Sequence, residues 1–229
     1  MATEPFRAGF LLFPELTQLD LTGPYEIIAA MPGAEAVLLW KTLEPVRSDR
    51  GLSMLPTETF GGCPRLDLIC VPGGPGINRL LVDDAVLDFV RRVARDARYV
   101  TSVCTGALVL GAAGLLRGRR AATHWASRHL LAEFGAKPVA ERVVVDGNVI
   151  TGGGVTAGID FGLRVVAEIL GQPAAEAIQL GVEYAPAPPF ASGSPETASP
   201  ALLAAMHERL APMLRERTAL VKEAAARLD

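Results

Sequence analysis

Apolar strand-like segments and helix-like segments alternate along most of this 229-residue chain, and this order constrains the fold more than any other feature. Short apolar runs predict strands at Phe6–Phe13, Ala36–Trp40, Asp67–Val71 and Tyr99–Val103. The segments between them predict helices at about Pro24–Met31, Asp84–Arg95 and Thr105–Leu115. Because parallel strands need crossover connections, this order predicts an α/β fold whose mostly parallel sheet is covered on both faces.

The second half of the chain predicts a hairpin, further helices and a C-terminal extension. These are a hairpin over Arg142–Thr151, helices at about Thr156–Leu170 and Ala174–Tyr184, a Pro-, Ser- and Ala-rich connector, and a last helix at about Pro200–Leu228. Ser199 is expected to cap that helix, because serine suits the N-cap and proline the first turn. We divide the chain into an α/β domain at residues 1–185 and an extension at 186–229, which packs on its own domain or on a dimer partner.

Composition narrows the class of protein. Half of the residues are hydrophobic and 21% are charged, which favours a folded domain over disorder. The net charge of −3 argues against a nucleic-acid partner, and no apolar run approaches the ~18 residues of a membrane span. The N-terminal residues do not resemble a signal peptide, and three irregularly spaced cysteines fit a reducing compartment. We therefore expect a cytoplasmic protein without a membrane or nucleic-acid partner.

The segment Tyr99–Leu108 predicts a reactive thiol. A β-branched run ends at Cys104 and a helix of small residues starts directly afterwards, so the cysteine lies on a turn between a buried strand and a helix N-terminus. Free N–H groups and the positive end of the helix dipole favour the thiolate there. The nucleophilic serine of many hydrolases occupies the same kind of turn. We interpret Cys104 as a nucleophile.

Four features follow the predicted strands and are expected to meet at one edge of the sheet, where parallel sheets bind ligands. They are Asp20, Gly73-Gly74, Cys104-Thr105 and Gly152–Gly154. Asp20 is a candidate to accept and return a proton, and Thr105 to donate a hydrogen bond. The two glycines at 73 and 74 allow backbone N–H groups to approach a developing negative charge, as in an oxyanion hole.

Each candidate also has a purely structural interpretation. Cys104 is alternatively a buried core cysteine, Asp20 a helix cap, and the glycine run from Gly73 an ordinary turn. His124 either pairs with Cys104 or has a structural role, and the residues favour the structural role. Cys70 is expected in the core and Cys63 in a loop. Three scattered histidines and no Cys-x-x-Cys pair argue against a metal site.

With these residues in view, the chain resembles the ThiJ/PfpI superfamily, which is related to class I glutamine amidotransferase domains. The resemblance covers residues from about 6 to 185. It rests on Gly9–Pro14, Leu19–Pro24, Val71–Gly74, Ser102–Gly106 and Thr123–Trp125. Within the superfamily the chain is most similar to the bacterial isonitrile (isocyanide) hydratases. That similarity rests on Asp20, where many relatives have glutamate, on Thr105, and on the segment Glu183–Phe190.

The resemblance implies a flavodoxin-like three-layer sandwich, with a mostly parallel central sheet and a C-terminal helical extension, that forms homodimers. It further implies that Cys104 is the nucleophile, Asp20 its acidic partner, and Gly74 and Thr105 part of an oxyanion-type pocket. The implied reaction adds water to a small-molecule isonitrile through a cysteine thioimidate, with no metal or organic cofactor. Protease-like members have histidine directly after the cysteine, where this chain has Thr105, so a Cys-His dyad is not expected.

Three other functions fit the same sequence. A glyoxalase- or deglycase-type cysteine enzyme of the superfamily would act on α-oxoaldehydes. The sensor half of an AraC-type transcription regulator has a similar domain, although only one helix follows residue 199 here. A redox sensor would oxidise Cys104 to a sulfinate.

Overall fold

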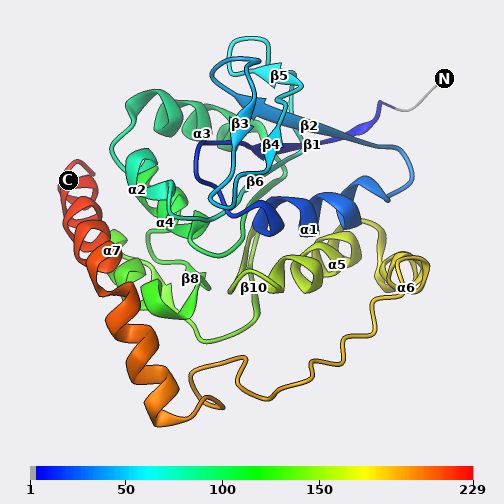
Figure 1. Ribbon diagram of the computed structural model, residues 1–229. Helices are drawn as coiled ribbons and strands as arrows, with labels where there is room; N and C mark the ends of the chain where they lie inside the picture. The colour runs from blue at the N-terminus through cyan, green and yellow to red at the C-terminus, as the bar shows by residue number, and fades with distance from the viewer. Residues whose placement is uncertain (1–3, 229) are drawn as a thin grey trace.

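The computed structural model describes residues 4–228 and contains a seven-stranded central sheet (Figure 1). The strand order is β10-β11-β7-β6-β1-β2-β5. All neighbouring strands are parallel except β10 and β11, which form the predicted antiparallel hairpin. The strands are β1 (Phe6–Leu11), β2 (Ala34–Trp40), β5 (Glu58–Thr59), β6 (Leu68–Val71), β7 (Tyr99–Ser102), β10 (Val143–Asp146) and β11 (Val149–Gly152).

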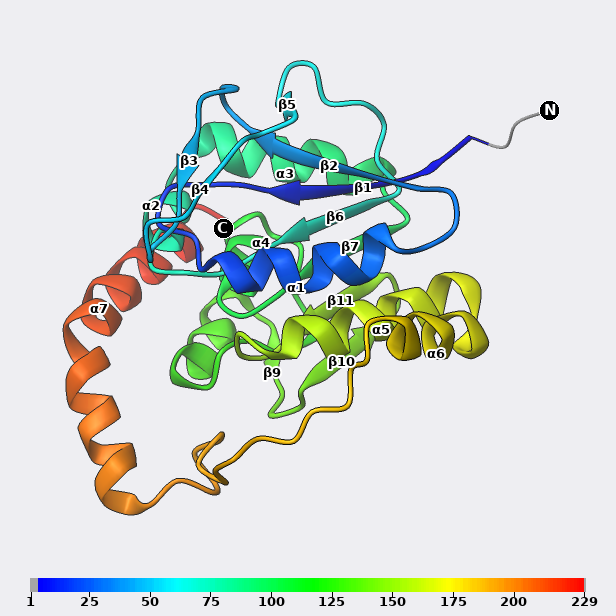
Figure 2. The same ribbon diagram turned by 45° about the vertical axis from the view of Figure 1, so that its right-hand side comes forward.

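Helices cover both faces of this sheet, which gives the predicted three-layer α/β sandwich. Helices α1 (Gln18–Ala29) and α5 (Ala157–Leu170) pack on each other on one face, and α6 (Gln172–Gly181) packs against α5 (Figure 2). Three helices lie on the other side: α2 (Ile77–Leu80), α3 (Asp84–Asp96) and α4 (Gly106–Ala112). The 3-10 helix η1 (Trp125–Phe134) packs on α4. Two small sheets complete the fold, β3 (Val46–Arg47) with β4 (Ser53–Met54) and β8 (Arg120–Ala121) with β9 (Lys137–Pro138).

The burial of the elements follows from their sequence patterns. All four residues of the interior strand β6 are buried, as expected for a parallel strand covered on both faces. Helix α3 is amphipathic and buries Val86, Phe89, Val90 and Val93, the four residues predicted to share one side. The side chain of Asp83 caps its N-terminus by accepting a hydrogen bond from the Val86 N–H.

Three predicted helix boundaries are wrong by three residues or more, and the start of α1 affects the site. Helix α1 begins at Gln18 rather than near Pro24, so Asp20 belongs to its first turn and not to a loop. Pro24 lies inside the helix, against Gly158 of α5, where a Cβ atom would lie 2.9 Å from the proline ring. This packing outweighs the tendency of proline to begin a helix. Helices α4 and α6 both end earlier than predicted, at Ala112 and Gly181.

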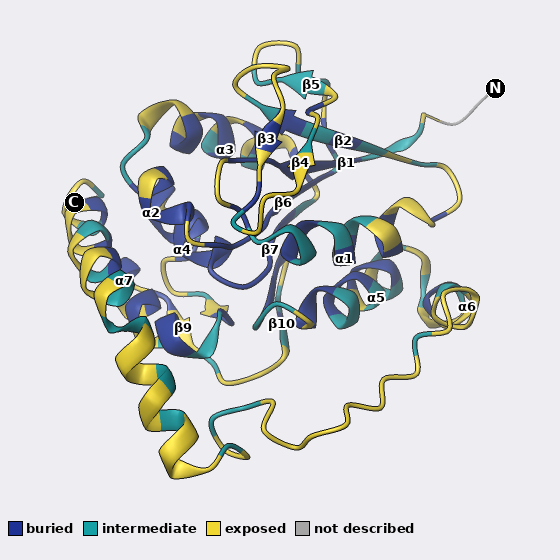
Figure 3. Ribbon diagram, viewed as in Figure 1, coloured by how far each residue is buried: buried dark blue, intermediate teal, exposed yellow. Residues whose placement is uncertain are grey.

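The C-terminal extension returns across the molecule to the far side of the domain. A mostly exposed connector follows α6 and leads to α7 (Pro200–Ala226) (Figure 3). The Ser199 hydroxyl caps the first turn of α7 as predicted. The N-terminal half of α7 is mostly exposed, whereas its C-terminal half buries Arg217, Val221 and Ala224. Helix α7 contacts η1, α4 and α2 of its own chain. No helix within residues 4–228 combines the length and apolarity needed to cross a membrane.

Candidate active site

Three turns at the carboxyl edge of the sheet meet beside Asp20. β6 ends two residues before Gly73, β7 ends two residues before Cys104, and β11 ends at Gly152. Because these three strands are parallel neighbours, their turns lie side by side. The structure therefore brings the predicted site segments together, with Asp20 supplied by α1. We call Asp20, Gly73, Cys104 and Thr105 the Cys104 corner.

The backbone at Cys104 is strained. Its φ of 55° lies in the left-handed region, which costs a non-glycine residue about 1–3 kcal/mol. Contacts on both sides hold the turn: the Cys104 N–H donates to the Gly152 carbonyl (3.1 Å) and the Thr123 hydroxyl donates to the Cys104 carbonyl (2.7 Å). A Cβ atom at Gly106 would lie 2.0 Å from the Val71 carbonyl oxygen, so only glycine permits this approach of α4 to β6. The sharp turn predicted from sequence is confirmed.

Asp20 is fully buried and does not cap α1. The N-cap residue is Thr17, and within the described residues neither Asp20 carboxyl oxygen accepts a hydrogen bond of ordinary geometry. Burial raises the pKa of Asp20 from 3.8 to about 7, although the nearby Cys104 thiol and Gly73 N–H lower it. At neutral pH this carboxyl group is therefore able both to accept and to donate a proton.

The Cys104 thiol does not match the prediction of a resting thiolate. The residue is only 5% exposed; burial and the neighbouring Asp20 carboxylate raise the pKa of the thiol well above its usual value of 9.0. The Thr105 N–H and the Arg217 guanidinium act in the opposite direction. Desolvation by burial thus outweighs the effect of the helix N-terminus on the pKa of the thiol. Sulfur and carboxyl therefore form a coupled pair, in which Asp20 is the more acidic partner.

The predicted oxyanion donors are present but already engaged. The Gly74 N–H donates to the Thr105 hydroxyl (3.0 Å), and the Gly73 N–H faces Asp20. A Cβ atom at Gly73 would lie 2.5 Å from the Thr105 backbone nitrogen and 2.8 Å from an Asp20 carboxyl oxygen. Glycine at position 73 thus allows Asp20 and Thr105 to approach the same turn.

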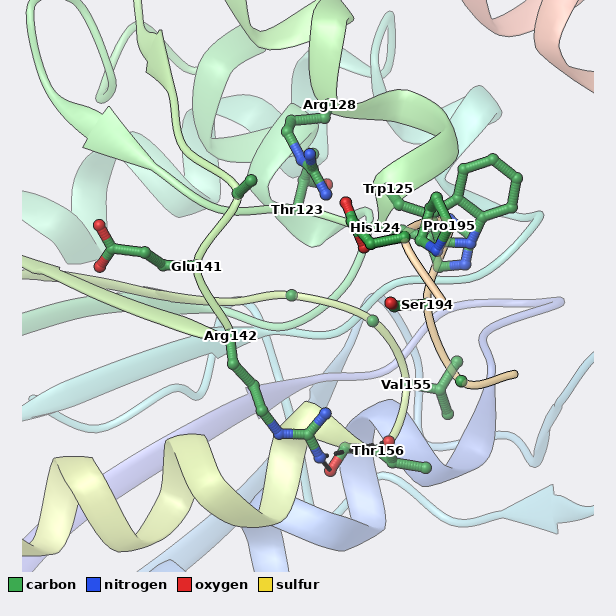
Figure 4. Close-up of a pocket in the computed structure, with 15 residues that line it drawn as sticks. Thr123, His124, Trp125, Arg128, Glu141, Arg142, Val155, Thr156, Ser194 and Pro195 are labelled. Atoms are coloured by element: carbon green, nitrogen blue, oxygen red, sulfur yellow. Dashed lines mark hydrogen bonds between the residues drawn. The ribbon is translucent and has the colours of Figure 1, made fainter. Parts of the chain in front are cut away.

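A pocket of about 400 Å³ lies next to this corner. Figure 4 shows the residues that line it. Its walls come from the start of η1, the segment before β10, the β11–α5 turn and the connector before α7, and they include His124, Arg142, Val155 and Pro195. Cys104 does not line the pocket. Thr123 and Gly153 do. Thr123 donates a hydrogen bond to the Cys104 carbonyl, and Gly153 directly follows Gly152, whose carbonyl accepts from the Cys104 N–H. The pocket therefore lies immediately outside the turn that holds the sulfur.

His124 has the structural role that the residues favoured. It is the N-cap residue of η1, and its Nδ1 accepts a hydrogen bond from the Ala126 N–H (3.3 Å). Burial, together with the cations of Arg217 and Arg128, lowers its pKa from 6.5 to about 4, so the ring is neutral at pH 7. The other two cysteines also lie where predicted: Cys70 is buried in β6 and Cys63 lies in the loop before it.

Sequence reasoning missed Arg217, which α7 places 3% exposed near the Cys104 corner. The signal was present in the pattern of the last helix. Arg217 lies three residues after Leu214 and four before Val221, on the apolar side of that helix. A charged residue within an apolar stripe indicates a specific buried partner.

Comparison with known proteins agrees with this arrangement. The model of the DJ-1/PfpI family matches residues 6–168. A protein of Pseudomonas putida named isonitrile hydratase is 57% identical over 223 residues, which cover 97% of this chain and 98% of the relative. The crystal structure of a ThiJ/PfpI family protein from Pseudomonas syringae superimposes with a TM-score of 0.93 at 46% identity and covers 95% of this chain and 90% of that one.

A more distant relative has a name that indicates a different function. The HTH-type transcriptional regulator GbdR of Pseudomonas aeruginosa is 31% identical over 183 residues, which cover 76% of this chain but only 49% of the regulator. The shared region is thus about half of that protein. The likeness to the Pseudomonas syringae structure confirms the flavodoxin-like sandwich with its C-terminal helix.

Proposed function

The chain belongs to the DJ-1/PfpI family, and on that premise we propose that it is an isonitrile hydratase, which converts an isocyanide and water into an N-substituted formamide. The identity of 57% with a relative of that name, over nearly the whole of both chains, supports the substrate class. The observation that carries the chemistry is the pair formed by the strained Cys104 and the fully buried Asp20. Such a pair supplies a nucleophile and a proton at one point.

The first step adds the S–H group across the terminal carbon of the isonitrile. Asp20 takes the thiol proton, the sulfur electron pair forms a bond to the carbon, and protonated Asp20 delivers the proton to the same carbon. One N–C π bond is lost, and the product is a thioimidate, R–N=CH–S–Cys104. The protonated resting thiol suits this step, because the carbon needs both the sulfur and its proton.

The second step adds water and releases the enzyme. Asp20, again a carboxylate, removes a proton from water as the oxygen attacks the thioimidate carbon, and the nitrogen gains a proton. The adduct R–NH–CH(OH)–S–Cys104 expels the sulfur, which recovers a proton, and R–NH–CHO leaves. A pKa of about 7 allows Asp20 to act as base and acid in turn at neutral pH.

We assign the substituent R to the pocket outside the turn. Its walls combine polar and apolar side chains, including His124, Val155 and Pro195, and its volume of about 400 Å³ accommodates a small ring. His124 contributes no proton in this scheme, because it is neutral and its Nδ1 caps η1.

Product identification tests the proposal. Purified protein is incubated with an aromatic isonitrile, and we expect the matching N-aryl formamide by mass spectrometry and NMR. In a parallel reaction methylglyoxal replaces the isonitrile, and we expect no lactate. Formation of lactate without formamide would instead support the glyoxalase-type alternative. Absence of both products from a folded sample contradicts the hydratase.

A homodimer and a cytoplasmic location stay predictions. They are supported by the family resemblance and by the composition of the chain, respectively. Size-exclusion chromatography coupled to light scattering measures the oligomeric state directly.

A further inference from the structure

Arg217 is a buried cation that has no anionic partner of its own among residues 4–228. Its guanidinium donates to three neutral oxygens: the Asn78 side-chain carbonyl (2.9 Å), the Ser127 hydroxyl (3.0 Å) and, more weakly, the Gly74 carbonyl (3.4 Å). No carboxylate in the part of the chain that the structure describes forms an ion pair with it. Removing a charge from water is costly, so a buried arginine with only neutral acceptors requires another source of stabilisation.

The neighbouring residues hold the guanidinium in place. The Asn78 amide group donates to the exposed Glu216 carboxylate (3.0 Å), which turns the Asn78 carbonyl oxygen toward Arg217. Asn78 lies in α2 and Ser127 in η1, so the arginine of α7 joins two elements that flank the Cys104 corner. The planar guanidinium group carries several N–H donors and reaches three separate acceptors, which an apolar side chain cannot do.

One of these acceptors belongs to the turn that contacts Thr105. The Gly74 carbonyl accepts from Arg217, and the Gly74 N–H donates to the Thr105 hydroxyl. The φ of Gly74 is 141°, a conformation that other residues rarely adopt. The Gly74 carbonyl also accepts from the Thr105 hydroxyl (3.4 Å), so Arg217 and Thr105 hold this residue together.

The charges near the sulfur are opposite in sign. Asp20 of α1 raises the pKa of the Cys104 thiol and Arg217 of α7, which donates to the Gly74 carbonyl, lowers it. His124 and Glu216 are the other titratable groups that interact with Arg217, and Arg128 adds a second cation at His124. Burial lowers the pKa of Arg217 to about 10, and negative charge at Cys104 counteracts this shift. The attraction between the two groups is therefore mutual.

We propose that Arg217 is a positioning residue for the hydration reaction: it holds the Gly74 carbonyl and supplies the positive charge that stabilises the Cys104 sulfur when this loses its proton. The inference rests on the proposed function for its catalytic consequence. The stabilisation of the Cys104 thiolate by the Arg217 charge does not depend on the substrate and holds for any chemistry at Cys104. It also assigns a role in the site to the C-terminal helix.

The test measures the rate of Cys104 alkylation by iodoacetamide as a function of pH, in the full chain, with the modified peptide quantified by mass spectrometry. A Cys63→Ser background removes the half-buried second thiol. In Arg217→Met we expect the midpoint of the pH dependence of alkylation to rise by about one pH unit or more. The alkylation rate at neutral pH then falls about tenfold. In the same variant kcat for the isonitrile falls more than KM changes.

Two variants separate charge from shape. Arg217→Lys keeps the cation and loses the planar guanidinium group, so its alkylation midpoint stays closer to that of the wild type than does Arg217→Met. Arg215→Met removes an exposed arginine from the same helix and is expected to leave the profile unchanged. Thermal melting of each variant checks that α7 is still folded.

An exchange of neighbouring groups keeps the test decisive if Arg217→Met does not fold. The double variant Asn78→Asp, Glu216→Gln retains the net charge and moves a carboxylate inward to the guanidinium. We expect this new ion pair to neutralise Arg217 and to raise the alkylation midpoint without lowering the melting temperature. An unchanged midpoint in this double variant, or in a folded Arg217→Met, overturns the proposal. Failure of the wild type to hydrate isonitriles contradicts only the proposed function, because the thiol titration does not use that substrate.

Discussion

Two aspartates on the helices α1 and α5, which pack on each other, have opposite surroundings. Asp160 of α5 accepts hydrogen bonds from Arg142 (2.6 Å) and Tyr184 (3.0 Å), and we call these three residues the Arg142 cluster. Asp20 of α1 is fully buried beside Cys104 and has no such partners among residues 4–228. Paired charges satisfy the Arg142 cluster at the wall of the pocket, whereas the Cys104 corner is strained and electrostatically unfavourable.

This difference indicates where the chemistry occurs. Stabilising contacts pair charges and leave the backbone relaxed, as at Asp160. The Cys104 corner instead maintains a positive φ and a carboxyl group with a pKa of about 7, and both are costs that the surrounding fold must offset. The same costs give the corner a mobile proton next to a nucleophile.

The largest expected effect comes from removing the sulfur. Cys104→Ala is expected to lower the rate of isonitrile hydration by about 10³-fold or more, because no other group supplies the nucleophile. Formamide production followed by chromatography measures the loss, and circular dichroism confirms the fold. Turnover at the wild-type rate in this variant would falsify the thioimidate scheme.

Asp20→Asn removes the proton carrier and is expected to lower kcat by about 10²–10⁴-fold. The limb of the pH–rate profile that reports this carboxyl group disappears as well. An unchanged profile together with a reduced rate contradicts the proton role.

The same substitution also changes how stability depends on pH. Because burial raises the pKa of Asp20 from 3.8 to about 7, the folded chain retains this proton between those values while the unfolded chain releases it. This contribution to the free energy of unfolding is complete below about pH 4 and is lost as the pH rises to 7. We therefore expect the melting temperature of Asp20→Asn, relative to the wild type, to rise from pH 4 to pH 8. A constant difference would show that Asp20 has an ordinary pKa.

Gly73→Ala tests the close packing of the corner. The added Cβ atom would overlap both the Thr105 backbone and the Asp20 carboxyl, so we expect about a 10-fold to 100-fold loss of activity from their displacement. Gly154→Ala is the matched control at the pocket, where the nearest atom, in His124, would lie 3.6 Å away. Equal losses in the two variants would contradict the special role of position 73.

The smallest effect is expected in the Arg142 cluster. Asp160→Asn weakens its contacts with Arg142 and Tyr184, but the site is partly exposed, so the free energy of unfolding falls by less than about 1 kcal/mol. Activity stays within about twofold of the wild type. Chemical denaturation and initial rates measure both, and a large loss of activity would mean that Asp160 fixes the position of Arg142 in the pocket wall.

The sequence by itself determined the layered α/β order, the amphipathic α3, the capped start of α7 and the turn at Cys104. Each depends on local periodicity or on the conformational preferences of a few adjacent residues. The start of α1 was predicted wrongly because Pro24 is accommodated by Gly158, a contact distant in sequence.

Only the tertiary structure decided the electrostatics of the site. Burial, which depends on the whole fold, made the Cys104 thiol a protonated partner of Asp20 instead of the thiolate that the helix terminus predicted. Burial also keeps the His124 ring neutral. The fold places Arg217, which lies more than a hundred residues after Cys104 in the sequence, next to the corner. Local sequence specifies which groups reach a site, but their proton affinities depend on the solvent and charges that the complete fold excludes or brings near.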